Sequence, residues 1–469
     1  MTAVLAPSAA GLPVIGSLLD LQRNSLNAFS RARREHGDVV RFVAGPPGLR
    51  VEFYGVFSAE GAQQVLAADS ANFRKDNKFY LEVRDSVGDG LLTSQDADYL
   101  RQRRLVQPLF TRRRVDSYAA TMCDEVSTAI ERWRDAPSRT VDLLTESTGL
   151  TLRIVSRILF GADVEVAVDV VRRCFPVVAD YTRQRGFAPA TLPRHWPTPG
   201  NRRAAAAQRE LHAVCDKIIA RNRRQPPARG DHADGQSSGA HTGGHEDGMA
   251  DLLGLLANAT DADGDRLSAS EIRDQVLVFL LAGHETTATS VAFALHLLAR
   301  HPDAQRTARE EVDRVLGTHR PGADDVDVLP YVTKVVKEAM RLYPAAPAIG
   351  RRAVEDTEVD GYRVPGDANV FVSPWVTHRH PAYWDDPERF DPERFTPEAE
   401  AARPRYAWFP FGGGPRACIG QRFSMLESVL AVAVVLQAYE LTAIDTDVPL
   451  ALGITLRANG PLRCRVTAR

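Results

Sequence analysis

A glycine-rich stretch that contains one cysteine, Phe411 to Gly420, holds the residues best suited to chemistry. The three successive glycines at 412–414 favour a tight turn, because glycine inside a helix or strand loses too much backbone entropy. The apolar spacing over 421–439 predicts a helix directly after this turn. Cys418 would then lie near the N-terminus of that helix, where exposed amides and the helix dipole favour thiolate over thiol. A thiolate held in this way is a nucleophile or a metal ligand.

A lone cysteine is most often a small buried hydrophobic residue, so an inert Cys418 is the alternative. Cys418, however, is part of a longer pattern, Phe-x-x-Gly-x-x-x-Cys-x-Gly, in which Arg416 precedes the sulfur by two residues. The pattern resembles the haem-binding loop of the cytochromes P-450, which are haem-thiolate monooxygenases. The resemblance implies haem b as cofactor, Cys418 as its iron ligand, Arg416 as a partner of a haem propionate, and a cofactor loop that includes Phe411, Gly414 and Gly420.

A second stretch with chemical potential, Ala282-Gly-His-Glu-Thr-Thr287, lies inside a long apolar segment. Residues 268–271 have the form of a capping box and the apolar spacing continues to Leu298, which predicts one long helix. An acid and hydroxyls are costly in a buried helix, although Ser or Thr can bond back to a carbonyl one turn earlier. The stretch resembles the oxygen-activation motif of the family. The resemblance implies that Gly283 leaves room for dioxygen and that Glu285 and Thr286 deliver protons.

Two charged side chains three positions apart, Glu338 and Arg341, emerge on one face of a helix predicted over 329–343. Such a pair alone says little, since exposed Glu–Arg pairs contribute little to stability. Here it resembles the Glu-x-x-Arg motif of the family, and residues 390–395 resemble its Pro-Glu-Arg-Phe segment. The resemblance implies a buried brace of Glu338, Arg341 and Arg394 that holds the stretch leading to the cysteine loop, without chemistry of its own.

Two more segments imply further partners for the haem propionates. Tyr99 and Arg103 match the family's Trp-x-x-x-Arg, with Tyr in place of Trp, which keeps an aromatic donor but shortens it. Arg351 is expected to bind a propionate because of its spacing to Asp356, and Arg352 is the alternative. Most of the arginines near Arg103 are predicted to lie on a solvated face of the helix. Their clustered positive charge close to the haem could also bind an acidic electron carrier.

Apolar periodicity and turn signals place the elements that must hold these residues. From Phe73 to Leu92 the chain mixes apolar and charged residues irregularly, and its counterpart in the family is a variable loop over the substrate. The other predicted elements are a hairpin at 37–54, a helix at about 58–68, helical structure from 141 to 219 with a break at 189–200, a flexible loop at about 225–248, and a closing hairpin at 449–466 with its turn near 458–461. The resemblance implies one domain over residues 1–469, mainly α with a smaller β-rich part, with the haem between a long central helix and a C-terminal helix.

The pocket beside the haem is expected to be apolar. No charged anchor stands out among its candidate residues, so the predicted substrate is a lipophilic molecule such as a terpenoid, a steroid or a fatty acid. The candidates are Phe79, Leu81, Leu91, Phe279, Ala282, Ala346, Ile349 and Ile454.

The composition argues against several classes of protein. A net charge of -2 gives no sign of binding to nucleic acid or to an anionic surface. The five cysteines are odd in number and widely scattered, which is not typical of a disulfide framework. No basic residue precedes Arg23, and no apolar run approaches the ~20 residues of a membrane span. We therefore expect a cytoplasmic monomer without a membrane span.

The resemblance implies a monooxygenase that activates dioxygen and oxidises its substrate with electrons from outside. No flavin or nicotinamide region is recognisable, so a separate ferredoxin or flavodoxin with its reductase is expected. One alternative is a peroxide-driven peroxygenase or a haem-thiolate isomerase, branches that often lack the acid–alcohol pair present at Glu285 and Thr286. Another is a non-enzymatic haem-thiolate sensor or binding protein, in which that pair would have no use.

Overall fold

Helices account for most of the computed structural model, which describes residues 4–161, 164–188, 191–224, 252–260 and 264–469. The predicted class, mainly α with a smaller β-rich part, is confirmed. The flexible loop predicted at 225–248 lies outside the described residues. The helices are α1 (Leu18–His36), α2 (Ala59–Gln63), α3 (Lys78–Val87), α4 (Asp96–Val106), α5 (Arg112–Asp116), α6 (Ala119–Glu131), α7 (Leu143–Phe160), α8 (Val164–Phe187), α9 (Pro199–Arg224), α10 (Leu252–Asn258), α11 (Ala269–Arg300), α12 (Pro302–Leu316), α13 (Pro330–Leu342), α14 (Pro374–Thr377), α15 (Pro397–Ala402) and α16 (Gln421–Ala438).

The strands form small sheets. They are β1 (Val4–Leu5), β2 (Val39–Ala44), β3 (Val51–Val56), β4 (Phe73–Arg74), β5 (Thr140–Asp142), β6 (Ile349–Ala353), β7 (Thr357–Val359), β8 (Tyr362–Val364), β9 (Asn369–Val372), β10 (Tyr439–Ala443), β11 (Leu450–Leu452), β12 (Leu456–Ala458) and β13 (Arg463–Ala468). Within the described residues, the strand orders are β2-β3-β9-β6-β4, β1-β8-β7, β10-β13-β5 and β11-β12. The predicted hairpin at 37–54 is the antiparallel pair β2–β3.

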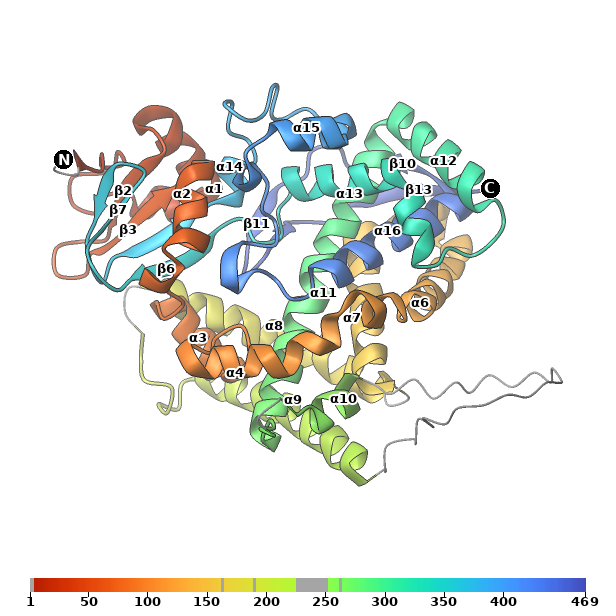
Figure 1. Cartoon of the computed structure of the whole chain (residues 1–469), viewed down its shortest axis with the longest axis horizontal. Coiled ribbons are helices and arrows are strands. Elements are labelled where there is room, and N and C mark those ends of the chain that lie inside the picture. Colours follow the sequence, from red (N-terminus) through yellow and green to blue (C-terminus); the bar gives the residue numbers. More distant parts are fainter. Residues whose placement is uncertain (1–3, 162–163, 189–190, 225–251, 261–263) are drawn as a thin grey trace.

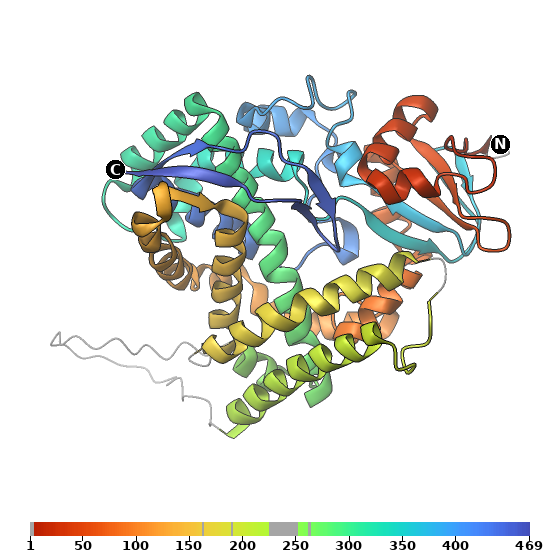
Figure 2. The same ribbon diagram turned by 180° about the vertical axis from the view of Figure 1, so that it is seen from behind.

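The helices and the largest sheet occupy different sides of the protein (Figure 1). Strands β2, β3 and β6 lie with the N-terminus on one side, and the C-terminus lies on the other. The view from behind shows α8 and α9 side by side along one edge, with the strands of the C-terminal sheet on the opposite edge (Figure 2). In both views α11 crosses the molecule between these parts.

The central helix α11 begins where the sequence predicts it. The side chain of Ser268 accepts the Glu271 N–H, and the Glu271 carboxylate accepts the Ser268 N–H, so the capping box is present. At ~1.5 Å per residue, a helix of this length is about 48 Å long and can cross the whole protein. It packs against α7, α13 and α16, and nearly all of its apolar side chains are buried. The predicted helix after the cysteine loop is α16, which is also almost entirely buried.

Two helices, α11 and α16, are long and apolar enough to cross a membrane by length and composition. In the most apolar 18-residue window of each, 78% and 72% of the residues are buried inside the protein. The core helix of a large domain can be as apolar as a membrane span, because other apolar residues surround it on all sides.

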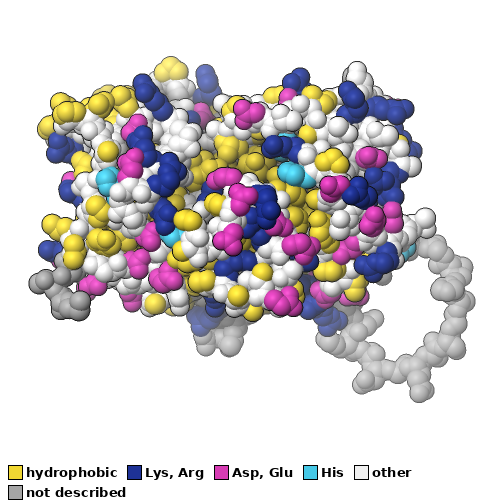
Figure 3. Space-filling model, turned by 90° about the horizontal axis from the view of Figure 1, so that it is seen from above, with side chains coloured by type: hydrophobic (Ala, Val, Ile, Leu, Met, Phe, Trp, Pro, Cys, Tyr) yellow, Lys and Arg dark blue, Asp and Glu magenta, His cyan; other side chains and the backbone are white. Residues whose placement is uncertain are grey.

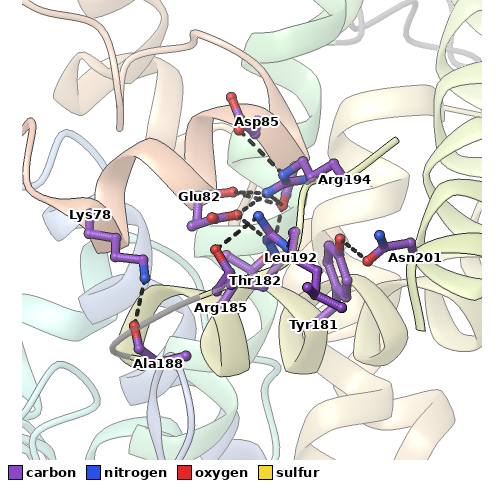
Figure 4. Close-up of polar contacts among 12 residues, drawn as sticks. Lys78, Glu82, Asp85, Tyr181, Thr182, Arg185, Ala188, Leu192, Arg194 and Asn201 are labelled. Atoms are coloured by element: carbon purple, nitrogen blue, oxygen red, sulfur yellow. Dashed lines mark hydrogen bonds and ion pairs between the residues drawn. The ribbon is translucent and has the colours of Figure 1, made fainter. Parts of the chain in front are cut away.

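The expectation of an irregular segment from Phe73 to Leu92 is wrong, because this segment contains α3. The helix begins at a local cap, in which the Asn77 side chain accepts the Tyr80 N–H. Its inward face carries Val83 and Val87, and two acidic residues beside them, Glu82 and Asp85, find partners on other parts of the chain (Figure 4). The apolar periodicity is therefore real but short, and intervening charges obscure it in the sequence.

The predicted closing hairpin at 449–466 is only partly correct. Its tight hairpin is β11–β12, whose turn lies at 453–455 and not at 458–461. The later turn leads to β13, which pairs with β10 and β5 in a different sheet. A turn signal marks a change in chain direction but does not identify the strand that pairs next.

Candidate active site

The cysteine loop is a tight turn that only glycine can form. The Cys418 N–H donates to the Phe411 carbonyl at 2.9 Å, which closes the loop. Gly414 has φ of +64°, and a Cβ at this position would lie 1.9 Å from the Leu66 carbonyl oxygen. The loop therefore needs glycine at 414 for both its backbone conformation and its close packing. Gly420 is the N-cap of α16, so Cys418 lies at the junction that the sequence predicts.

The Cys418 thiol is accessible although protein surrounds it, so it faces an interior space. Burial raises the pKa of the thiol, while the Gly420 N–H and the positive charges of Arg103 and Lys75 act in the opposite direction. The predicted bias toward thiolate is thus present but weaker than the effect of burial. A metal ion bound to the sulfur would reverse the balance, because coordination deprotonates a thiol outright.

The middle of α11 is the part of that helix that opens toward a space. Most flanking residues of α11 are buried, whereas Ala282 is exposed and Gly283, Glu285 and Thr286 are half-buried. Exposure in the middle of a core helix indicates an interior space and not the outer surface. The residues of the predicted oxygen-activation motif therefore share this open part of α11.

Several side chains donate hydrogen bonds to the carbonyls of this open part of α11. The Thr286 hydroxyl donates to the Ala282 carbonyl at 2.5 Å, and Thr151 of α7 donates to the His284 carbonyl at 2.8 Å. The first bond is the back-bonding that the sequence allows as a purely structural role for Thr286. Among the described residues, Oε2 of Glu285 is buried and has no hydrogen-bond partner. This carboxyl oxygen is available to a donor that the protein itself does not provide.

Gly283 has a packing role beside its predicted one. A Cβ at this position would lie 3.1 Å from Cγ2 of Val155 on α7. The glycine therefore lets α7 and α11 approach closely, and the direction in which a side chain would point leads to Val155. Any room that Gly283 leaves for dioxygen is bordered by that residue.

The Arg416 side chain extends from the cysteine loop toward α4. Its guanidinium stacks on the Tyr99 ring at 3.6 Å from the centroid and donates to Oε1 of Gln95 at 3.0 Å. Within the described part of the chain, its Nη1 is buried without a hydrogen-bond partner. Burial lowers the pKa of Arg416 to about 10, and the positive charge of Arg351 acts in the same direction. A buried guanidinium with an unused donor indicates an anionic group that belongs beside it.

Arg351 and Arg352 point to different partners. Arg351 is buried, with 3% of its surface exposed, and burial lowers its pKa. Arg352 pairs with Asp76 at 2.7 Å and also with Asp367. Because Arg352 is already neutralised by carboxylates, the geometry favours Arg351 as the residue that faces the anionic group.

The predicted pair on α4 holds the cysteine loop. The Tyr99 hydroxyl donates to the Pro415 carbonyl at 2.7 Å, and Nη1 of Arg103 donates to the Ala417 carbonyl at 3.2 Å. The expectation that Tyr99 donates to a propionate is therefore not supported, since its one hydrogen is used by the loop. Its ring contributes instead by stacking on Arg416.

Lys75 is a residue of this site that the sequence does not reveal. Its pKa is well below the usual value, because the amine is buried and lies near two cations, Arg351 and Arg416. The nearby Cys418 sulfur acts in the opposite direction. The local sequence gives one sign of this environment: Lys75 lies in a segment rich in aromatic residues, with Phe73 before it and Tyr80 after it.

The residues present fit the haem that the sequence predicts. Three cations gather here: Arg351 is buried, and Lys75 and Arg416 are half-buried. After burial, the charges of Arg351 and Arg416 lower the pKa of Lys75, and the charge of Arg351 lowers that of Arg416. The two propionates of haem b are the kind of counter-charge that such a cluster requires. Cys418 faces the same interior space, and its sulfur can serve as the thiolate ligand of the haem iron. Among the described residues, no group of three or more His, Cys, Asp and Glu side chains could hold a separate metal ion.

Three of the predicted pocket residues lie on segments that contact the cysteine loop, α11 or each other. Cδ1 of Ile349 would lie 3.7 Å from a Cβ at Gly412. Ile454 lies at the tip of the β11–β12 hairpin. Two residues later, Leu456 of β12 donates its N–H to the Ala345 carbonyl at 2.9 Å. The half-buried Ala346 follows Ala345 directly. The hairpin tip also reaches α11, because the Thr289 hydroxyl donates to the Leu456 carbonyl at 3.0 Å.

Four further predicted pocket residues, Phe79, Leu81, Leu91 and Phe279, have other surroundings, whereas Ala282 lies in the open part of α11. Phe279 is buried against Phe110, with ring centroids 5.3 Å apart, and Leu91 is buried in the same core. Phe79 packs on Phe187 of α8 at 5.3 Å. Leu81 is 45% exposed on the outward face of α3 beside charged residues, so its predicted place in the pocket is not supported. Because the sequence did not predict α3, its spacing could not separate the inward-facing from the outward-facing residues of that helix.

The predicted brace forms as a buried ion pair. Nε of Arg341 lies 2.6 Å from Oε2 of Glu338, and both side chains have 0% exposure. Arg341 also donates to the His378 and Pro387 carbonyls, at 2.9 and 2.7 Å. Nε of Arg394 lies 3.6 Å from the same Glu338 carboxylate. The guanidinium therefore joins a helix to the loops that lead toward the cysteine.

A histidine connects this brace to the cysteine loop. Nε2 of His378 accepts the Phe409 N–H at 2.9 Å, and the Phe409 carbonyl accepts the Gly412 N–H at 3.0 Å. Burial, and next the positive charges of Arg341 and Arg379, hold the pKa of His378 well below its usual value. The ring is therefore neutral, as an acceptor must be.

Comparisons with known proteins match nearly the whole chain. A family model described as Cytochrome P-450 matches residues 6–458. Pentalenene oxygenase from Streptomyces avermitilis is 34% identical over 471 residues, which cover 100% of this chain and 98% of that protein. Cyclooctatin synthase from Streptomyces melanosporofaciens is 35% identical and covers 97% of this chain and 93% of that protein.

A solved structure agrees with these matches. The haem domain of cytochrome P450DA superposes with a TM-score of 0.84 at 28% sequence identity, covering 100% of this chain and 99% of that one. The family match and the relatives above 30% identity both span nearly the full length of the sequence. This chain therefore belongs to the cytochrome P-450 family: it is a haem-thiolate monooxygenase with haem b as its cofactor.

Proposed function

We propose that this monooxygenase hydroxylates a lipophilic small molecule of the terpenoid class. The observation that carries the proposal is the apolar character of the residues that border the interior space: Ala282 is exposed in the open part of α11, and Ile349 lies against Gly412 of the cysteine loop. An apolar surface without a charged anchor suits a hydrocarbon-like substrate. Two relatives of similar length are named for pentalenene and cyclooctatin, which supports a cyclic terpenoid over a steroid or a fatty acid.

In this proposal the protein supplies a ligand, counter-charges and a proton path. Haem b bound through a thiolate supplies reductive activation of dioxygen, with the thiolate favouring O–O cleavage. Cys418 is the ligand, and Lys75, Arg351 and Arg416 neutralise the propionates. Arg103 and Tyr99 fix the cysteine loop.

Glu285 and Thr286 carry the protons that oxygen activation consumes. Oε2 of Glu285 has no partner among the described residues, so it can take a proton from water and release it toward the interior space. The Thr286 hydroxyl can rotate away from the Ala282 carbonyl and donate into that space. This pair also argues against a peroxygenase, an isomerase or a binding protein, because none of these requires protons to be delivered to oxygen.

The electrons come from a separate redox protein, a ferredoxin or flavodoxin with its reductase. Helix α5 carries three consecutive arginines at 112–114 and packs against α16, whose first turn follows the cysteine loop. Arg422 of α16 bonds to Asp116 of α5 at 2.6 Å, which joins these elements close to Cys418. A basic surface at this position suits an acidic carrier. We also propose a cytoplasmic monomer of one domain, since both long apolar helices are used as core.

The test is turnover with a defined electron source. The purified protein would be incubated with ferredoxin, reductase, reduced nicotinamide and a panel of cyclic terpene hydrocarbons under isotopically labelled dioxygen. The proposal predicts a product that contains one labelled oxygen atom. A parallel reaction with hydrogen peroxide and no reductase should give little product. Efficient turnover with peroxide alone, or no product from any terpene that perturbs the haem spectrum, would contradict it.

A further inference from the structure

Side-chain hydroxyls bond to the backbone carbonyls along the open part of α11. Within the helix itself, the Thr286 and Ser290 hydroxyls donate to the carbonyls four residues before them, at 2.5 and 3.2 Å. A carbonyl inside a helix accepts the N–H four residues later, and its second lone pair is free for another donor. Bonds of this kind stay within one helix and are common for Thr and Ser.

Thr151 makes a similar bond from another helix, α7. Its hydroxyl oxygen lies 2.8 Å from the His284 carbonyl oxygen of α11. Within α7, the Ser147 and Thr148 carbonyl oxygens lie farther away, at 3.0 and 3.4 Å. A hydroxyl has a single hydrogen, so these acceptors compete for it, and the shortest distance leads to α11. Thr151 is 1% exposed, so the competition takes place without bulk water.

The close packing of α7 on α11 brings Thr151 to this carbonyl. Val155, one turn after Thr151, borders Gly283, where a Cβ would lie 3.1 Å from Cγ2 of the valine. Two neighbouring positions on one face of α7 therefore meet Gly283 and His284. A side chain at position 283 would press α7 away from α11, so the glycine gives the Thr151 hydroxyl access to a backbone oxygen.

The carbonyl that Thr151 holds belongs to the peptide that leads into Glu285. A peptide is planar, so the His284 carbonyl oxygen and the Glu285 nitrogen move as one unit. The next peptide is held as well, because the Thr289 hydroxyl donates to the Glu285 carbonyl at 3.0 Å. Hydroxyls thus restrain the peptide planes on both sides of Glu285, and the one on the N-terminal side comes from α7.

These restraints matter because the Glu285 carboxyl has an oxygen that the described residues leave free. Its Oε2 is buried and has no hydrogen-bond partner among them. The direction of a side chain follows from the backbone that carries it and from a small set of rotamers. The backbone of α11 therefore sets where this oxygen points, and Thr151 helps to set that backbone.

We propose that Thr151 is a positioning residue for the monooxygenase reaction: its hydroxyl holds the His284 carbonyl and thereby directs the Glu285 carboxyl toward the interior space. The inference rests on the proposed function, since it assumes that Glu285 carries protons. In the coupled reaction, dioxygen, two electrons, two protons and the substrate give the hydroxylated product and water. In the uncoupled reaction, dioxygen, two electrons and two protons give hydrogen peroxide and leave the substrate unchanged. A displaced Glu285 carboxyl shifts the balance toward peroxide.

The first test measures the backbone of α11 without turnover. Thr151→Val, which removes the hydroxyl and keeps the branched shape, would be compared with wild type by hydrogen exchange and mass spectrometry of the resting haem protein. Amides of residues 282–290 should exchange about five-fold faster, the ratio expected for the loss of one ordinary hydrogen bond, while those of α16 stay unchanged. Thr151→Ser, which keeps the hydroxyl, should exchange as wild type does. Unchanged exchange at 282–290, or faster exchange throughout the core, would overturn the proposal.

A matched control comes from the same helix α7. Thr148 is half-buried, and its hydroxyl donates to the Leu144 carbonyl at 2.7 Å, a bond inside α7. Thr148→Val makes the same chemical change three residues before Thr151 and should leave the exchange of α11 as in wild type. Equal effects of the two valine variants would mean that any hydroxyl lost from α7 disturbs α11, which contradicts a specific role for Thr151.

The second test asks whether Thr151 acts through Glu285. The ratio of hydrogen peroxide to hydroxylated product would be measured with the ferredoxin system for Thr151→Val, Glu285→Gln and the double variant. Thr151→Val should raise this ratio about five-fold, and Thr151→Ser should restore it. The double variant should match Glu285→Gln alone, because residues that act as one unit have non-additive effects.

The outcomes separate the two proposals. If the effects of the single variants add in the double variant, Thr151 does not act through Glu285. If Glu285→Gln raises the ratio and Thr151→Val does not, the role of Thr151 is wrong while the proton path stands. If Glu285→Gln leaves the ratio unchanged, the proton path is wrong, and the role of Thr151 with it. The exchange test decides whether Thr151 holds α11 even if no terpene is oxidised.

Discussion

Positive charge gathered around one thiol is the main feature of the site at the scale of single residues. Arg351 is buried, Lys75 and Arg416 are half-buried, and burial followed by the charges of neighbouring cations lowers the pKa of Lys75 and of Arg416. A protein tolerates such a cluster only if a negative group completes it. The cluster therefore supports haem binding independently of the cysteine motif and can be tested separately.

The cysteine itself gives the most direct prediction. Cys418→Ala should abolish the absorption band that carbon monoxide produces with a ferrous, thiolate-bound haem, because no other side chain in the loop can replace the sulfur. Optical spectroscopy of the reduced, carbonylated protein measures this. The haem content should be checked in parallel, since the cationic cluster should keep part of the haem bound. An unchanged band in the variant would refute the ligand assignment.

Lys75 provides a test of the cationic cluster. Lys75→Met keeps the length of the side chain but removes its charge, so a propionate should lose one partner. Haem should then transfer to apomyoglobin about ten-fold faster than from wild type, as expected for one charge-assisted hydrogen bond. Lys217→Met, a change at an exposed lysine of α9, is the control. If both variants release haem at the wild-type rate, Lys75 does not contact the cofactor.

At the scale of elements, the cysteine loop is held through His378. Its neutral ring accepts the Phe409 N–H, and burial lowers its pKa. The unfolded chain would bind a proton at this histidine below about pH 6.5, whereas the folded protein would not. The contribution to the free energy of unfolding is therefore complete above that pH and is lost as the pH falls toward the lower, folded-state pKa.

This linkage can be measured by urea unfolding between about pH 5 and pH 7.5. The wild-type free energy of unfolding should fall with decreasing pH by up to about 1.4 kcal/mol per pH unit for this histidine. His378→Gln should be less stable at pH 7.5 but should show a shallower slope. Some slope remains, because burial also lowers the pKa of His284 and brings that of His296 to about 4. His195→Gln, at an exposed position, should follow wild type.

Elements whose signals are local could be predicted from the sequence. The start of α11 follows from Ser268 and Glu271, which cap one turn, and the glycine loop and α16 follow from neighbouring residues as well. Helix α3 could not be predicted, because Glu82 is balanced by Arg185 and Arg194, which lie 103 and 112 positions away. The same reason hides Lys75, because the two cations that lower its pKa after burial, Arg351 and Arg416, lie far along the chain. Spacing in the sequence predicts contacts between residues that are close along the chain, and it does not predict contacts between residues that are far apart.

At the scale of the whole molecule, charge is distributed without a dominant sign. Figure 3 shows acidic and basic side chains interspersed over the face seen from above, which agrees with the net charge of -2. A partner that recognises this protein electrostatically must therefore use a local patch. The arginines at 112–114 on α5, near the start of α16, are our candidate for that patch.

Electron transfer tests this surface. Arg113 is exposed, and Arg113→Glu should slow reduction of the haem by ferredoxin several-fold at low ionic strength, with the difference shrinking as salt is added. Stopped-flow reduction at several salt concentrations measures the effect. Arg172→Glu on α8 makes the same change of charge at an exposed site on another helix. Equal slowing by both variants would mean that net charge, and not the α5 surface, governs the encounter.

Strand β13 places a constraint on how the protein is made. It is the middle strand of its sheet, pairing with β10 on one side and with β5, more than 300 positions earlier, on the other. β5 leads directly into α7, which packs along α11, so the helical core remains without its sheet until residues 463–468 have left the ribosome. During synthesis the apolar faces of α7 and α11 lack their full cover, which exposes the nascent chain to aggregation and makes a chaperone useful. Stable enclosure of haem is accordingly a step that follows translation.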